Sequence, residues 1–112
     1  MRTPFKVDVV RDRGVLARLV EGGRIENVYR LQIMNATEVE QRFVISAQGL
    51  PGLEVLVEGE VVIASTQARW VAVRVQAPFD VASPGSHAIR FLVATHGPAG
   101  QVTEDSVFIV PR

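Results

Sequence analysis

The segment Ile25-Glu-Asn-Val-Tyr-Arg-Leu-Gln-Ile-Met-Asn35 decides the fold class of this chain. Large apolar side chains recur in it at every second position, at Tyr29, Leu31 and Ile33, and polar side chains separate them. Successive side chains of a strand point to opposite faces, so this alternation predicts a strand with one buried face. The strand is expected to end at Asn35-Ala36-Thr37. This triplet also matches the glycosylation sequon, but an Asn at a strand end is ordinary turn chemistry and the turn is the favoured interpretation.

The same alternation extends along the chain in both directions. Clusters of Gly, Pro, Asn and Ser separate the further predicted strands, which are Phe5–Val10, Gln41–Ala47, Arg69–Gln76, Ser86–Thr95 and Val102–Val110, together with the short pieces Val15–Leu19, Leu53–Val57 and Val61–Ile63. The segments 25–35 and 41–47 are predicted to form a hairpin. Twenty Val and six Ile, against seven Leu, further favour strands.

These strands predict an all-β fold. About seven or eight short antiparallel strands with regular turn signals, and no helical periodicity, are typical of an immunoglobulin-like two-sheet β-sandwich. The 112 residues correspond to a single domain. Since the chain has no cysteine, no disulfide can join the sheets, and we expect the core side chains to hold them together by packing alone.

Composition excludes several classes of function. Twelve Lys plus Arg balance twelve Asp plus Glu, so the formal net charge is zero. This balance argues against nucleic-acid binding, which needs a basic surface. The lack of cysteine excludes cysteine-ligated zinc or iron–sulfur sites and a cysteine nucleophile. No run approaches the ~20 apolar residues that span a bilayer, so this segment is not expected to insert into a membrane.

Residues that could perform catalysis or bind metal do not form a recognisable site. His87 and His96 flank one predicted strand and, at ~3.3 Å per residue, lie too far apart to share a metal ion. The carboxylates that lie close in sequence are interpreted as turn and edge charges: Glu58, Glu60, Glu104 and Asp105. The sequence contains no calcium loop, nucleophile elbow or phosphate-binding loop. We therefore expect no catalytic residue and no metal site.

Three apolar residues occupy positions that the alternation assigns to the outside. In the segment 69–76 the valines take the inward face, which places Trp70 on the outer face or at the sheet edge. Leu92 and Phe108 show the same conflict. Trp70, Leu92 and Phe108 are therefore a candidate interaction surface. The alternative is an error of register, because one bulge reverses the direction of every later side chain.

Two blocks of the sequence resemble a known family. They are Val9-Val-Arg-Asp-Arg-Gly-Val-Leu-Ala-Arg18 and Gly23-Arg-Ile-Glu-Asn-Val-Tyr-Arg-Leu-Gln-Ile-Met-Asn35, with weaker matches at Gly49-Leu50, from Val73 to Pro78, and at Gly85 with Ile89-Arg90-Phe91. Over nearly its whole length the chain resembles the C-terminal immunoglobulin-like domain of the FixG/CcoG family of cytochrome c oxidase accessory proteins.

The resemblance implies that residues 1–112 are one domain excised from the C-terminus of a larger membrane protein with two 4Fe–4S clusters. Members of the family are implicated in reducing cupric to cuprous ion during assembly of the cbb3-type oxidase. The cluster ligands and membrane helices are missing from this chain, so the resemblance implies a noncatalytic accessory domain without its own cofactor. Copper binding by the domain itself is not expected, because cuprous ion favours Cys and Met, and only Met1 and Met34 are present.

The resemblance also implies a location and partners. The domain is expected on the periplasmic side of the bacterial inner membrane, in contact with the parent's membrane domain and with oxidase assembly or copper-handling proteins. The block Arg11, Asp12 and Arg13 would follow the last membrane helix and set the orientation of the domain. Its plain structural role is an edge segment whose charges resist pairing with other chains.

Two other function classes remain open at this stage. One is a ligand-binding module for sugar or metal that uses the loops around His87 and His96. The other, a small hydrolase, is disfavoured because no nucleophile motif is present.

Overall fold

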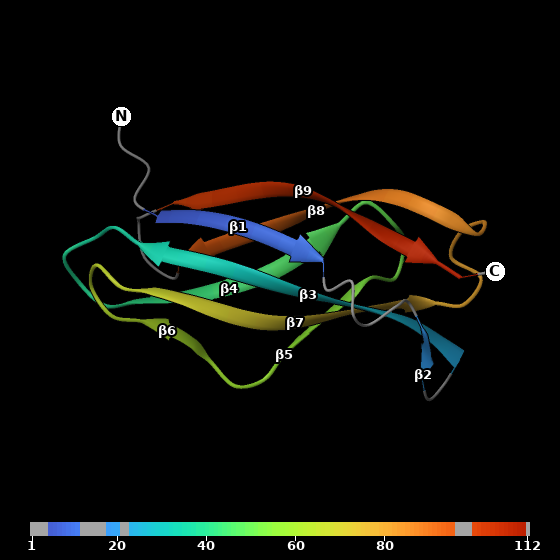
Figure 1. Cartoon of the computed structure of the whole chain (residues 1–112), viewed down its shortest axis with the longest axis horizontal. Coiled ribbons are helices and arrows are strands. Elements are labelled where there is room, and N and C mark those ends of the chain that lie inside the picture. Colours follow the sequence, from blue (N-terminus) through green and yellow to red (C-terminus); the bar gives the residue numbers. More distant parts are fainter. Residues whose placement is uncertain (1–4, 12–17, 21–22, 96–99, 112) are drawn as a thin grey trace.

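The chain folds as a β-sandwich of two antiparallel sheets in a computed structural model that describes residues 5–11, 18–20, 23–95 and 100–111. For Arg11 and residues 18–20 only the backbone is described. Nine strands lie within these ranges (Figure 1): β1 (Phe5–Arg11), β2 (Arg18–Val20), β3 (Arg24–Asn35), β4 (Gln41–Gln48), β5 (Glu54–Val57), β6 (Val61–Ile63), β7 (Ala68–Pro78), β8 (Gly85–Thr95) and β9 (Gln101–Val110).

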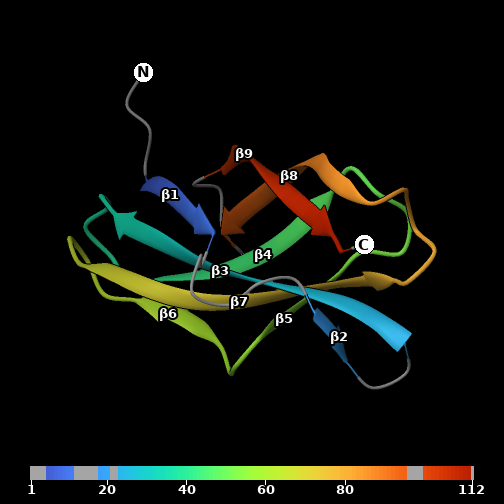
Figure 2. The same cartoon turned by 45° about the vertical axis from the view of Figure 1, so that its right-hand side comes forward.

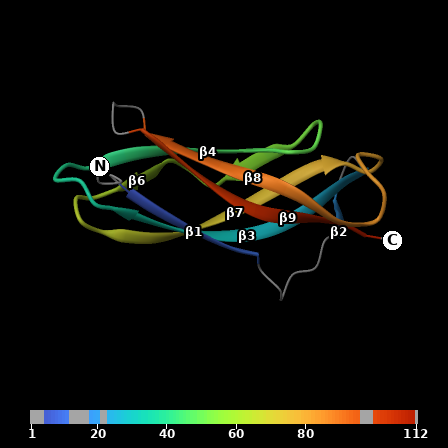
Figure 3. The ribbon, with the colours of Figure 1, turned by 90° about the horizontal axis from the view of Figure 1, so that it is seen from above.

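Sheet A contains the strands β1–β3–β7–β5 in that order, and sheet B contains β6–β4–β8–β9. The short strand β2 also pairs with β3, beside residues 24–26, whereas β1 pairs beside residues 29–35. The two views in Figures 2 and 3 show the sheets as two layers that cross at an angle. The predicted all-β sandwich is confirmed. It has nine described strands instead of seven or eight because each of the short segments β2, β5 and β6 pairs as a separate strand.

The hairpin predicted for residues 25–35 and 41–47 does not form. β3 lies in sheet A and β4 in sheet B. Both edges of β3 are already paired, one with β1 and β2 and the other with β7, so β4 has no free edge beside it. The prediction was wrong because it rested on nearness in sequence, whereas the partners of β3 come from other parts of the chain.

Asn35 directs the chain from one sheet to the other. It is fully buried, and its Oδ1 accepts a hydrogen bond from the backbone N–H of Thr37 at 3.0 Å. Its Nδ2 donates to the carbonyl oxygens of Val39 at 2.9 Å and Ile63 at 3.0 Å. The turn interpretation of the sequon is therefore confirmed, because the amide nitrogen that would carry a glycan is buried and engaged.

The chain crosses from sheet A to sheet B between the edge strands β5 and β6. β5 pairs with residues 73–76 of β7 in sheet A, and β6 pairs with residues 41–43 of β4 in sheet B. Residues 58–60 connect them. As a consequence, within the described residues the first half of β7, residues 68–72, has a strand neighbour only in β3.

The core lies between the sheets and follows the predicted alternation. The inward-facing valines of β7 and the predicted inward residues of β3 and β8 are buried, together with other apolar side chains, and the core includes Val71, Val73, Val75, Tyr29, Leu31, Ile33, Ile89, Phe91 and Val93. Two aromatic pairs bridge the sheets edge to face. The ring centroids of Tyr29 and Phe91 lie 4.9 Å apart, and those of Phe5 and Phe43 lie 5.0 Å apart.

The sequence predicted that packing alone would hold the sheets together, but hydrogen bonds between the sheets also contribute. Asn27 and Tyr29 on the inner face of β3 also bond to the backbone of β9. Nδ2 of Asn27 donates to the carbonyl of Ile109 at 3.0 Å, and its Oδ1 accepts from the N–H of Ile109 at 2.9 Å. The Tyr29 hydroxyl donates to the carbonyl of Val107 at 2.6 Å. These side chains serve as the partners that a neighbouring strand would otherwise provide to the outer edge of β9.

Candidate functional site: the outer face of sheet A

The three residues predicted to form one interaction surface lie in three different places. Trp70 lies on the outer face of sheet A, 51% exposed. Leu92 is half-buried on the outer face of sheet B, between Ser46 and Thr103. Phe108 is fully buried in the core. The predicted grouping is therefore wrong, and Trp70 is the member that remains strongly exposed.

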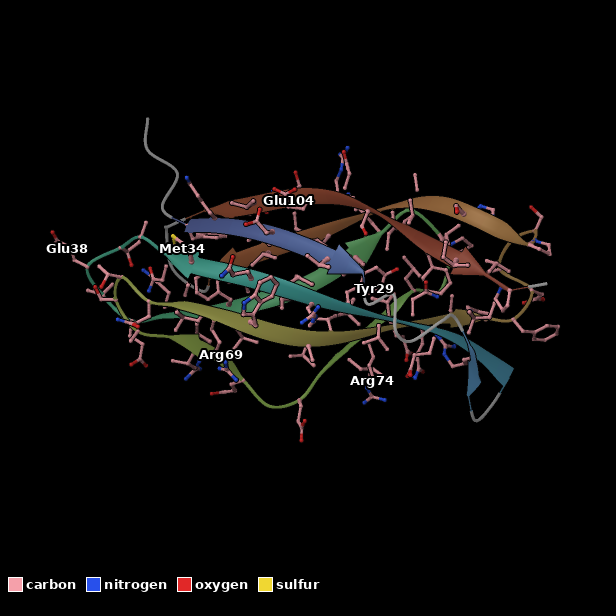
Figure 4. All side chains as sticks on the ribbon, viewed as in Figure 1. Tyr29, Met34, Glu38, Arg69, Arg74 and Glu104 are labelled. Atoms are coloured by element: carbon pink, nitrogen blue, oxygen red, sulfur yellow. The ribbon has the colours of Figure 1, made fainter. Side chains whose placement is uncertain are left out.

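Trp70 shares the outer face of sheet A with exposed apolar residues from two other strands. In the register of the sheet, Trp70 of β7 is opposite Gln32 of β3, so Met34 lies diagonally beside it. Met34 is 44% exposed, and Val10 on β1 is 41% exposed. We call the surface formed by Val10, Met34 and Trp70 the Trp70 face. Figure 4 shows Met34 near the end of β3 on this side of the molecule.

Arg30 connects the members of the Trp70 face. It is opposite Val10 on one side and Ala72 on the other, and its guanidinium carbon lies 5.7 Å from the centroid of the Trp70 ring. Cation–π contacts of this kind are worth roughly 0.5–1 kcal/mol at exposed sites. The flanking residues of β7, Ala68 and Ala72, are small. The indole thus stands above its neighbours with one side held by Arg30, as a flat apolar surface open to a partner.

The sequence alone did not identify Val10, Met34 and Arg30 as neighbours of Trp70. Met34 continues the outward positions of Arg30 and Gln32, so its direction could have been read from the alternation. Its nearness to Trp70 depends on the pairing of β3 with β7, which are far apart in the chain. Register between distant strands is not encoded in the alternation of either strand.

A buried carboxylate lies farther along the outer side of the same sheet. Glu26 is 1% exposed, and its Oε2 accepts a hydrogen bond from Nε2 of Gln76 at 2.8 Å. Nη1 of Arg74 lies 3.4 Å from the same oxygen. Because a buried charge is costly unless it is paired and hydrogen-bonded, Glu26 fixes both β7 side chains. It thereby places the guanidinium of Arg74 on the outer side of β7.

The other residues singled out in the sequence have structural partners or lie outside the described residues. Nε2 of His87 lies 2.6 Å from the carbonyl oxygen of Ser83, whereas His96 is outside the described part. Asp105 accepts from Nε of Arg90 at 2.9 Å. Glu60 lies 3.5 Å from Arg42. Glu58 is exposed and Glu104 is half-buried on β9 (Figure 4).

The charged block proposed to set the orientation of the domain falls mostly outside the described residues. The backbone of Arg11 ends β1 opposite Tyr29, and Asp12 and Arg13 lie beyond the described range. In the part of the chain that the structure describes, no three His, Cys, Asp or Glu side chains gather closely enough to hold a metal ion. The same part contains no helix that is long and apolar enough to cross a membrane.

Comparison with known proteins supports the fold and identifies the family. A crystal structure of a FixG-related protein from Vibrio parahaemolyticus is similar with a TM-score of 0.79 and 20% sequence identity, covering 95% of each chain. A yeast GGA1 GAE domain gives a TM-score of 0.45 at 11% identity, covering 100% of this chain and 95% of that chain. No curated protein matches the chain. The sequence profile of the immunoglobulin-like fold at the C-terminus of FixG, a proposed oxidoreductase, matches residues 1–111. The chain therefore belongs to the family of FixG C-terminal immunoglobulin-like domains.

Proposed function

We propose that this chain is a noncatalytic docking domain of a FixG-type protein, and that it contacts the membrane domain of that protein through the Trp70 face. The observation that carries the proposal is the exposure of Val10, Met34 and Trp70 on three adjacent strands of sheet A. Trp and Met are enriched in the centres of protein interfaces, and Trp is a frequent energetic anchor there. Arg30 adds a cation between Val10 and Trp70 within this surface.

The proposed parent is a membrane-bound iron–sulfur protein that reduces cupric ion during assembly of a cbb3-type cytochrome c oxidase. Family membership supports this assignment, and the clusters and the electron path belong to the parent in this proposal. The domain itself would lie on the periplasmic side of the inner membrane and would bring the parent into contact with assembly or copper-handling proteins. Its own ionisable side chains support a structural role, because Glu26, Asp105 and His87 contact neighbouring groups of the fold.

The proposal can be tested in the full-length FixG-type protein that carries this domain. A specific protease site is placed ahead of Phe5, and cleaved membranes are then sedimented. The wild-type domain should stay with the membrane fraction after cleavage. The double substitution Met34→Ser and Trp70→Ser should release most of the domain into the supernatant.

A matched control uses apolar residues on the opposite face of the sandwich. Val44 and Val107 are also exposed, at 49% and 39%, but they lie on the outer side of sheet B. Their replacement by Ser should leave the domain with the membranes. Equal retention of the wild type and the Met34/Trp70 variant would refute docking through the Trp70 face.

A further inference from the structure

The first half of β7 has a free backbone edge beside Trp70. The N–H of Asn35 donates to the carbonyl of Gln67 at 2.9 Å, which fixes the hydrogen-bond phase of the β3–β7 ladder. Backbone groups of an antiparallel strand point to its two sides at alternate residues. Arg69 and Val71 therefore bond toward β3, and the N–H and C=O groups of Trp70 and Ala72 point the other way.

A second contact agrees with this phase. The carbonyl of Gln76, which has the same parity as Trp70 and Ala72, lies 3.4 Å from Nη2 of Arg24, and the same nitrogen donates to Gly52 ahead of β5. Even-numbered residues of β7 thus direct their backbone toward the β5 side. β5 pairs only as far as Val57 opposite Val73, so the edge at Trp70 and Ala72 has no strand beside it in the described part of the chain.

The free edge borders a hollow in the surface. A cavity of about 410 Å³ lies there, lined by Val57, Glu58, Arg69, Trp70, Val71 and Ala72. Figure 1 shows that after β5 the chain turns away from β7 and loops outward before it forms β6. The five residues 68–72 extend over about 17 Å at the rise of a strand. An incoming segment of about five residues in extended conformation would continue the line of β5.

The charges around the edge favour an acidic segment. Arg69 is exposed and lines the cavity (Figure 4), whereas the guanidinium of Arg74 is already paired with Glu26. Arg30 is held over Trp70, and Glu58 is the carboxylate that lines the cavity. A second copy of this edge would bring the same guanidinium groups together, which opposes self-pairing because like charges repel across a sheet.

We propose that the edge of β7 at Ala68–Ala72 binds an extended acidic segment of the parent protein by adding it to sheet A as a strand. Backbone hydrogen bonds supply affinity in this mode of recognition, and side-chain charge supplies selectivity. The inference rests on the proposed docking function, because Trp70 belongs to both the Trp70 face and this edge.

The test uses the complete 112-residue chain and a labelled hexapeptide of alternating Glu and Val. Binding is measured by fluorescence anisotropy and, independently, by the emission of Trp70, the single tryptophan of the chain. The Glu peptide should bind saturably, and the same peptide with Lys in place of Glu should bind much more weakly. Arg69→Glu should narrow or reverse this preference.

Substitutions at Ala72 separate backbone recognition from side-chain contact. Ala72→Pro removes an N–H from the free edge without removing a bond to β3, and it should weaken binding by about tenfold, the usual effect of losing one such donor. Ala72→Val keeps the N–H and should bind like the wild type. If Ala72→Pro does not fold, N-methylation of alternate peptide residues, which blocks one edge of the peptide, should weaken binding to the wild type.

Several results would overturn the inference. These are equal binding of the Glu and Lys peptides, no saturable binding at millimolar peptide, no effect of N-methylation, or sedimentation of the chain as a dimer that Ala72→Pro dissociates. The membrane-release experiment with Met34→Ser tests the docking proposal separately from strand addition, because Met34 belongs to the Trp70 face and not to the edge of β7. If Met34→Ser releases the domain from membranes but the wild-type chain binds no peptide, the docking proposal stands and the strand-addition proposal fails.

Discussion

Three buried polar side chains of β3 determine which parts of the chain meet. Asn27 and Tyr29 bond to the backbone of β9, and Asn35 bonds to the backbone at the end of β6. A buried polar group that loses its partner costs more than the hydrogen bond itself contributed. These residues therefore penalise other arrangements of the sheets, which an apolar core would tolerate.

Replacing Asn27 by Ala should lower the free energy of unfolding by about 1–3 kcal/mol, because both backbone groups of Ile109 lose their partner. Tyr29→Phe removes one bond and keeps the ring, so its cost should be about 0.5–1.5 kcal/mol. Urea denaturation of the purified chain measures both values. Thr103→Ala, an exposed position on β9, should change stability by less than about 0.5 kcal/mol. If Asn27→Ala were equally mild, Asn27 would have no role in joining the sheets.

At the scale of single residues, the alternation of the sequence predicted the outward position of Trp70 but failed for Phe108. The difference lies in the neighbours. β7 has Val at the three inward positions that follow Trp70, whereas the inward side of β9 includes Glu104 and Ser106 beside the buried Phe108. A strand with polar residues on both faces gives no reliable parity.

At the scale of elements, the position of nearly every strand could be predicted from the sequence, but the strands with which it pairs could not. The predicted segment 69–76 lies within β7, and 86–95 differs from β8 by one residue. Local alternation and turn residues are sufficient to find such segments. The sheet membership of β4, β5 and β6 depends on which edges distant strands have already occupied, and this information is not local.

The connection between β4 and β5 requires glycine at position 49. Gly49 has φ 131°, and a Cβ there would lie 2.8 Å from the carbonyl oxygen of Ala88 and 3.0 Å from Cα of Ile89. Both are backbone atoms of β8, which cannot move without disturbing sheet B. The resemblance at Gly49-Leu50 thus has a physical reason, since the loop passes too close to β8 for a side chain.

Gly49→Ala should therefore destabilise the fold by at least about 2–3 kcal/mol, combining backbone strain with the clash. Gly59 provides the matched control, because it also has a positive φ, 72°, but a Cβ at this position would meet no described atom within 4 Å beyond its chain neighbours. Gly59→Ala should cost only about 1–2 kcal/mol for the left-handed backbone. Thermal or urea unfolding compares the two variants. Equal costs would show that the approach to β8 is not limiting.

At the scale of the whole molecule, the candidate site arises from the assembly of sheet A. Val10, Met34 and Trp70 come from β1, β3 and β7, and no one of these strands carries a recognisable motif for docking. The free edge of β7 likewise arises because the chain leaves sheet A after β5 and enters sheet B as β6. The sequence could therefore indicate Trp70 as an exposed aromatic residue, but the surface around it exists only in the folded sandwich.

The two sheets should unfold as one unit although no disulfide joins them. Phe91 of sheet B packs edge to face on Tyr29 of sheet A, and Asn27 and Tyr29 also bond to β9. Trp70 reports on the outer side of sheet A, whereas Phe91 is a buried core residue of sheet B. Phe91→Leu should lower the free energy of unfolding by about 1–3 kcal/mol and shift the denaturation midpoints of Trp70 fluorescence and far-ultraviolet circular dichroism equally, as two-state unfolding requires. Val107→Ser on the outer side of sheet B should leave both midpoints nearly unchanged. If Phe91→Leu moved the circular dichroism midpoint but not that of Trp70, the sheets would be separate folding units, and contacts across the core would not transmit stability from one sheet to the other.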